Sequence, residues 1–240
     1  MVDNEMAVTE HLEELRRRII VSGVSVFIAT VILYNKILVV INFLMKPIEK
    51  FKLNFAYFSL TEGFITRLKV SLFAAIILVS PIIFYEIIAF ISPGLTKKEK
   101  KLLCFGVLYL SIFFLSGVVL GYVIILPYTL KFLITYSNSY MNPLLSGNMY
   151  FSFIGLFCTA VGITFTIPLI FLLLAKQKLI EVKTLMKWRK YVVAAVLAVE
   201  LCFVPSVDLV IFSIIMLPVI VLYEVNIWIF YFKEKIINKK

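Results

Sequence analysis

Carboxylates set among basic side chains are the residues of this sequence best suited to bind a cationic partner. They lie in two segments, HLEELRRR at residues 11–18 and SPGLTKKEKK at residues 92–101. In the first, Glu13 and Glu14 are separated by one leucine from three consecutive arginines. In the second, Glu99 is one acid among four lysines. A carboxylate has about four acceptor sites, so Glu99 can receive a cation from outside while also bonding a helix end.

Both segments also have a purely structural interpretation, which stays open. Residues 11–18 predict an amphipathic helix with Thr9 as its N-cap, in which Glu14 pairs with Arg18 at i,i+4. Thr96 and Glu99 have the spacing of a capping box, in which the acid bonds the backbone N–H of Thr96.

No side-chain group with the spacing of a catalytic or metal site accompanies these acids. Cys104, Cys158 and Cys202 are far apart within apolar runs, and His11 is the one histidine. This pattern indicates neither a zinc site nor a disulfide framework. We therefore expect no enzyme activity, no catalytic residues, no metal and no cofactor.

The composition indicates an integral membrane protein. Of the 240 residues, 62% are hydrophobic and 16% are charged, and the mean hydropathy is +1.03. Soluble domains average about 45–50% apolar and about 25% charged residues. A soluble domain of this size has too little interior for so many apolar side chains, which excludes a soluble enzyme or a disordered chain.

Six apolar segments predict an all-α membrane protein with six transmembrane helices in a single domain, residues 1–240. Residues 1–18 form the amphipathic helix before the first span. The fifth segment, of about 14 residues, would rise only ~21 Å as a helix, and Pro205 ends it, so we expect short fifth and sixth helices joined at residues 205–208. The predicted spans are 19–41, 64–91, 102–134, 150–175, 191–204 and 209–232.

The basic residues predict the orientation. Seventeen of the 24 lysines and arginines lie either before span one or after spans two, four and six, whereas the loop at residues 136–149 has none. Cytoplasmic loops carry the excess of basic residues, so both termini are expected on the cytoplasmic or stromal side. The net charge of +10 is then explained by topology, and we expect the lipid bilayer rather than nucleic acid as the surrounding partner.

Acids and aromatics within the spans need separate interpretations. Glu86 and Glu224 lie near span ends, where pairing with lysine or reaching the surface is the less costly arrangement. For Glu200, inside the short fifth span, a functional and a neutral structural role stay equally open. Three tyrosines are interpreted as interface aromatics, namely Tyr136, Tyr140 and Tyr150.

The order of several motifs resembles the TatC family, the polytopic receptor component of the twin-arginine protein translocase. HLEELRRR is similar to the family's HLxELRxR, and Pro47 matches a proline of the first external loop. Residues 60–72 resemble the approach to span two, and residues 80–99 resemble that span and the following loop. Further matches, in order, are Gly117, Tyr122, Pro127, GITFTIP (162–168), RKY (189–191), PSVD (205–208), Pro218 and Glu224.

The resemblance implies a receptor for the twin-arginine signal peptides of folded proteins, which starts assembly of a translocation complex driven by the proton-motive force. It assigns the arginine contacts to Glu14 and Glu99, with Leu12, Arg16 and Phe90 shaping the same surface. It implies TatA- and TatB-type single-span partners, an oligomer, and an energy-transducing membrane: thylakoid, another organellar inner membrane, or bacterial inner membrane. The matched docking or structural positions are Pro47, Glu62, Tyr122, Thr166, Pro168, Asp208 and Glu224.

One departure from the family pattern and one rival function stand beside this interpretation. Many relatives have Glu or Gln before the span-four proline, where this chain has Thr166, whose hydroxyl can hydrogen-bond across helices but carries no charge. The alternative function is a small secondary transporter or channel subunit. It would require matching halves around a polar midplane site, and the sequence has no such halves.

Overall fold

Long apolar runs without polar alternation form helices here, because a helix satisfies its own backbone hydrogen bonds inside a membrane. A computed structural model describes residues 2–51, 55–56, 58–91, 97–137, 144–176, 182–203, 212–213, 216–225 and 227–228. It leaves out the side chains of residues 2–9, 91, 97–103, 136–137, 171–176, 182–186 and 199–203.

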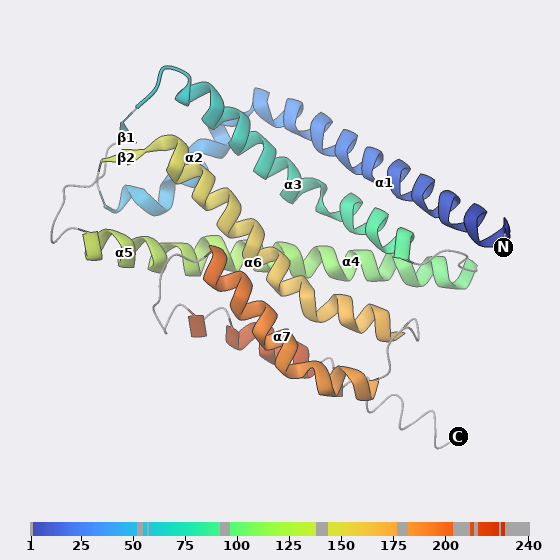
Figure 1. Ribbon diagram of the computed structural model, residues 1–240. Coiled ribbons are helices and arrows are strands. Elements are labelled where there is room, and N and C mark those ends of the chain that lie inside the picture. Colours follow the sequence, from blue (N-terminus) through green and yellow to red (C-terminus); the bar gives the residue numbers. More distant parts are fainter. Residues whose placement is uncertain are drawn as a thin grey trace.

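The helices pack against one another as a bundle (Figure 1). A π-helical segment, η1, joins α4 to α5 into one continuous rod, and two short strands pair in parallel between distant loops. The elements are α1 (Val2–Asn35), α2 (Ile37–Glu49), β1 (Phe55–Ala56), α3 (Glu62–Ile91), α4 (Lys97–Leu120), η1 (Gly121–Ile125), α5 (Leu126–Ser137), β2 (Leu145–Ser146), α6 (Gly147–Lys176) and α7 (Val182–Phe203).

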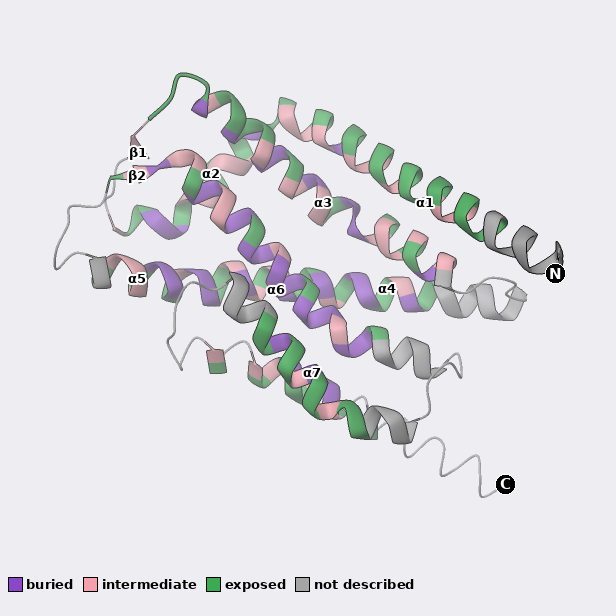
Figure 2. Cartoon of the chain, in the orientation of Figure 1, coloured by how far each residue is buried: buried purple, intermediate pink, exposed green. Residues whose placement is uncertain are grey.

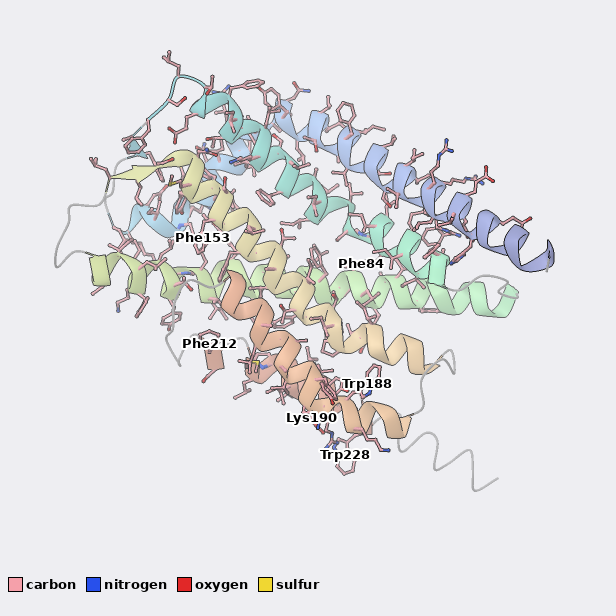
Figure 3. The ribbon with its side chains drawn as sticks, viewed as in Figure 1. Phe84, Phe153, Trp188, Lys190, Phe212 and Trp228 are labelled. Atoms are coloured by element: carbon pink, nitrogen blue, oxygen red, sulfur yellow. The ribbon has the colours of Figure 1, made fainter. Side chains whose placement is uncertain are left out.

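Helix α6 lies at the centre of the packing, and α1 lies at its edge. α6 contacts α3, α4 and α7, whereas α1 packs chiefly along α3. In the most apolar window of α6, 61% of residues are buried within the protein, against none in that of α1 (Figure 2). Away from its contact with α3, α1 therefore leaves many apolar side chains exposed on the protein, where lipid can cover them. Between α3 and α4, Phe84 packs edge-to-face on Phe114 at 5.5 Å (Figure 3).

Four helices of the described residues are long and apolar enough to cross a membrane, which makes the protein an almost entirely helical membrane protein. A shorter apolar helix, Met216–Val225, follows α7 within the predicted sixth span. The four are Glu10–Asn35, Glu62–Phe90, Cys104–Thr135 and Gly147–Ile170.

The first helix differs from the sequence prediction at both ends. It begins at Val2, so Thr9 lies inside it and is not its N-cap. It ends at Asn35 rather than at residue 41, because the chain turns at Lys36 (φ −110°, ψ 16°) and starts α2. The Asn35 amide donates to the carbonyl of Val31, and such side-chain bonds to the backbone compete with helix continuation.

Three other features were not predicted from the sequence, and one predicted segment lies outside the description. Helix α2 covers the end of the predicted first span and the beginning of the predicted external loop, a π-helical turn interrupts the third span, and β1 pairs with β2. Helix α7 begins at Val182, well before the predicted start at residue 191, since the basic residues there continue the helix. The predicted turn at residues 205–208 is outside the described residues.

Candidate functional site

Three charged side chains meet at the end of the bundle that carries the N-terminus. Arg18 donates from Nε to Glu14 Oε1 (3.0 Å) and from Nη1 to Glu86 Oε2 (3.0 Å), and its Nη2 also bonds Glu14 Oε1. We call Glu14, Arg18 and Glu86 the charged trio. Two carboxylates with one guanidinium leave it one negative charge in excess.

Helix geometry assembles the trio. Glu14 and Arg18 stand one turn apart on α1, as the i,i+4 spacing predicted. Glu86 reaches them from α3, which runs antiparallel to α1 (Figure 1). One turn further out, the ring of His11 stacks on Phe90 with centroids 4.4 Å apart. The sequence predicted that Glu86 either pairs with lysine or reaches the surface. The partner is an arginine, because the packing of α1 on α3 places Arg18 opposite it.

Glu14 is the accessible member of the trio. Its side chain is 34% exposed, against 23% for Arg18 and 14% for Glu86. Both bonds from Arg18 end on Oε1, and within the described part of the chain Oε2 of Glu14 accepts no hydrogen bond. This oxygen can accept a donor from outside, and a charge-assisted bond there is stronger than a neutral one.

The other residues expected to bind signal peptide are only partly brought together. Phe90 lies half-buried beside the trio. Leu12 and Arg16 are exposed one turn apart, on a face about 160° around α1 from Glu14. The side chain of Glu99 is outside the described residues, although α4 begins at Lys97, at the same end of the bundle as the start of α1 (Figure 1).

At the opposite end of the bundle, the structure joins two predicted positions that are distant in sequence. Pro47 sits buried inside α2. It has no N–H to bond the carbonyl of Phe43 one turn earlier. The hydroxyl of Tyr122, from η1, donates to that carbonyl, and the two rings stack with centroids 4.6 Å apart.

Tyr150 supports the same turn of α2 from another side. It donates to the carbonyl of Leu44 at 3.0 Å and is buried. Its interpretation as an interface aromatic was therefore wrong, because its hydroxyl has a backbone partner inside the protein.

Glu62 organises the loops at this end. Its buried carboxylate accepts the backbone N–H of Phe58 (2.7 Å) and of Asn148 (3.3 Å), and the hydroxyl of Ser146. Lys69 donates to the Asn148 side chain at 3.0 Å. Glu62 thus ties the start of α3 to β2 and to the start of α6.

The remaining predicted positions lie in α6 and near the C-terminus. Thr166 and Pro168 are buried inside α6. Thr166 donates to the carbonyl of Ile163 in its own helix (2.7 Å), and among the described residues it has no hydrogen bond to another helix. Glu224, expected to pair with lysine or to reach the surface, pairs with Arg189 of α7 at 2.9 Å. Trp188, Lys190 and Trp228 lie toward the same end of the molecule (Figure 3). Asp208 is outside the described residues.

Sequence reasoning found Glu14 and its helical partner but missed the part that Arg18 and Glu86 play together. The i,i+4 pattern indicates local pairs only, and Glu86 is 68 residues away from Arg18.

A metal ion such as zinc is held by several ligand side chains clustered around it. Among the described residues, no group of three or more His, Cys, Asp or Glu is arranged to hold a metal ion.

Known proteins resemble this chain over almost its whole length. The Sec-independent protein translocase protein TatC of Carboxydothermus hydrogenoformans is 32% identical over 229 residues, covering 95% of this chain and 94% of the relative. The chloroplastic TATC of Pisum sativum is 38% identical, covering 94% of this chain and 64% of the relative. The crystal structure of a twin-arginine translocase receptor, TatC, in DDM superposes with a TM-score of 0.78 at 31% identity, covering 91% of this chain and 98% of that one.

The family itself is matched over most of the sequence. Residues 10–218 correspond to the family described as Sec-independent protein translocase protein (TatC). This range includes all three residues of the charged trio and the whole α2–η1 contact. The chain therefore belongs to the TatC family of Sec-independent protein translocase proteins.

Proposed function

We propose that this protein is the receptor subunit of a twin-arginine translocase, and that Glu14 binds an arginine of the signal peptide. The observation that carries the proposal is the bonding of Glu14, whose partly exposed carboxylate already accepts two N–H groups of one guanidinium. A planar guanidinium presents that pair and an ammonium does not. The similarity to a solved receptor of this name supports the same function.

Glu99 is proposed as the second carboxylate, with Leu12, Arg16 and Phe90 completing the binding surface. α4 places Glu99 on its first turn, at the same end of the bundle as the trio (Figure 1). The two acids then face the two adjacent arginines of one peptide from separate helices. Because Leu12 and Arg16 lie on another face of α1, we propose that they contact the residues flanking the arginine pair.

The membrane arrangement belongs to the proposal too. The protein is an integral membrane protein of the kind found in bacterial and thylakoid membranes. We infer six spans in one domain of residues 1–240, with both termini and the charged trio on the cytoplasmic or stromal side. The distribution of basic residues supports this orientation. α7 and the helix Met216–Val225 are the proposed fifth and sixth spans.

The proposed partners are TatA- and TatB-type single-span proteins, within an oligomer driven by the proton-motive force. Pro47, Glu62 and Tyr122 would keep the external end in one shape for them, while Thr166, Pro168, Asp208 and Glu224 belong to the docking or structural positions of α6 and the C-terminal helices. The relative is named a protein translocase protein, and this name favours a translocase subunit over a small secondary transporter, a channel subunit or an enzyme.

The test is peptide binding to single variants in membranes. Glu14→Gln and Glu99→Gln are each expected to weaken crosslinking of a twin-arginine signal peptide about tenfold, since a hydrogen bond to a charged group contributes about 1.5–3 kcal/mol. Gln would keep the capping bond that the sequence predicts for position 99. Glu13→Gln, one residue away on an exposed site, is the matched control. Parent-like binding by both variants contradicts the proposal.

A further inference from the structure

The guanidinium of Arg18 occupies the carboxylate that the proposed function assigns to the peptide. Two of its N–H groups bond Glu14, and a third bonds Glu86. We propose that Arg18 is an internal competitor for Glu14, and that Glu86 retains the Arg18 guanidinium when a signal-peptide arginine replaces it. This inference rests on the proposed function, because it requires a ligand arginine at Glu14.

The burial order of the trio supports an exchange at Glu14 and retention at Glu86. An incoming guanidinium reaches Glu14 first, since this residue is the most exposed of the three, and Glu86 the least. A charge left unpaired in a partly buried place is costly. Because Arg18 keeps its bond to Glu86 after it leaves Glu14, the exchange leaves no unpaired guanidinium. Glu86 thus determines how easily the site opens.

Removing Arg18 has effects of opposite sign, and this makes the inference testable. Its loss frees Oε1 of Glu14 and removes a positive charge that repels the ligand, so both effects raise affinity. Arg18 also restrains the Glu14 side chain, and loss of that restraint lowers affinity. In the competitor role the first two effects prevail. In a purely positioning role the third prevails, so the sign of the change separates the two.

A competitor acts on every ligand alike. It reduces the fraction of protein whose Glu14 is available, and the apparent affinity of any cation falls by that same fraction. Arg18 therefore leaves the ratio between arginine and lysine ligands unchanged. It lowers both affinities, so that a weak ammonium ligand binds too poorly to hold the site.

The experiment uses the purified full-length protein in detergent and a fluorescent peptide with two adjacent arginines before an apolar segment, alongside its twin-lysine version. Arg18→Gln is expected to raise the affinity for both peptides by the same factor, about two- to fivefold, the range of a partly exposed ion pair. Arg18→Lys is expected to give a smaller rise. Arg17→Gln removes the same charge from the next, exposed position and is expected to change affinity less than twofold.

A substitution of Glu86 is expected to change the peptide affinity in the opposite direction. Glu86→Gln is expected to lower the affinity about two- to fivefold in the parent, because Arg18 would then be held by Glu14 alone, and to have no effect once Arg18→Gln is present. A fall in affinity in Arg18→Gln, or an equal effect of Glu86→Gln in both backgrounds, overturns the proposal.

The failure of this proposal is distinguishable from failure of the proposed function. If Glu14→Gln weakens binding while Arg18→Gln also weakens it, Arg18 positions Glu14 and the competitor role alone is lost. If Glu14→Gln leaves binding unchanged, the assignment of Glu14 to a signal-peptide arginine is lost. Thermal unfolding of each variant checks the fold, and misfolding cannot produce the expected gain in affinity.

Discussion

A single missing N–H explains why Pro47 and Tyr122 occur in the same protein. The proline leaves the carbonyl of Phe43 without its helical donor, and the Tyr122 hydroxyl donates to it from η1. The pair lies 79 residues apart in the chain. Each position was expected from the family resemblance, but their contact was not, because no local spacing connects them.

This relation predicts a non-additive pair of substitutions. Tyr122→Phe is expected to lower the free energy of unfolding by about 1 kcal/mol, the net contribution of one hydrogen bond. In a Pro47→Ala background the helix regains its own N–H donor for the Phe43 carbonyl, so the same change is expected to cost about half as much or less. Denaturant unfolding in detergent micelles measures both. Equal costs in the two backgrounds would show that the hydroxyl acts elsewhere.

The charged trio shows the same limit of sequence reasoning at single residues. The Glu14–Arg18 pair was predictable because helical spacing alone brings the two side chains together. Glu86 was predicted only to pair with lysine or to reach the surface, and its partner is Arg18. The identity of that partner depends on the register between α1 and α3, which long-range packing decides.

At the scale of elements, glycines set how closely α6 approaches its neighbours. A methyl group added at Gly155 would lie 2.3 Å from the ring of Phe73 in α3 and 2.9 Å from its Cβ. Because the Cβ of Phe73 is itself too close, rotation of the ring cannot relieve the clash. Gly23 of α1 has no heavy atom within 4 Å of the corresponding point.

We therefore predict opposite effects for two glycine-to-alanine changes. Gly155→Ala is expected to destabilise the protein by about 1–3 kcal/mol, as overpacking of a tight core does. Gly23→Ala is expected to be neutral or to stabilise by up to about 1 kcal/mol, since alanine is the better helix former. Thermal unfolding in one detergent compares the two. A similar loss in both would mean that helix packing is not the cause.

Glu62 links three elements, and a change of one atom tests it. Glu62→Gln replaces a carboxylate oxygen by an NH2 group that faces N–H donors, so at least one of its bonds is lost. The expected cost is about 1–3 kcal/mol, that of a buried donor left without a partner. Glu49→Gln, on the exposed end of α2, is the control. Parent-like stability of Glu62→Gln, measured by unfolding in urea, would remove Glu62 from this role.

The helical segments themselves were largely predictable, and the connections were not. Apolar runs gave the approximate places of α3, α4 to α5, and α6, because burial in lipid requires length and hydrophobicity alone. The start of α2 depends on a turn at Lys36. The pairing of β1 with β2 depends on loops brought together by the whole bundle, and no local pattern encodes it.

At the scale of the whole molecule, the two ends of the bundle differ in chemistry. One end carries the charged trio, with Glu14 partly exposed, and the other carries buried hydrogen bonds around Glu62 and the Phe43 carbonyl. An accessible ionic surface suits a transient ligand. A buried network suits a part of the molecule that keeps one shape.

The orientation of the whole chain in the membrane can be tested by cysteine labelling. In a chain whose three cysteines are replaced by alanine, Glu13→Cys is expected to react with an impermeant maleimide only from the cytoplasmic or stromal side. Lys50→Cys, on the exposed end of α2, is expected to react only from the other side, since α1 separates the two positions by one membrane span. Labelling from sealed vesicles of each orientation measures this. Reaction of both positions from one side would refute the arrangement.

The contrast between α1 and α6 has an evolutionary consequence. Val24, Ile28 and Ile32 of α1 are exposed on the protein, and the lipid that can cover them accepts any apolar side chain of similar size. Ile154 and Phe157 of α6 are fully enclosed and must fit several helices at once. Neutral drift should therefore exchange apolar residues freely along the outer face of α1, while changes in α6 should become fixed only together with compensating changes in its neighbours.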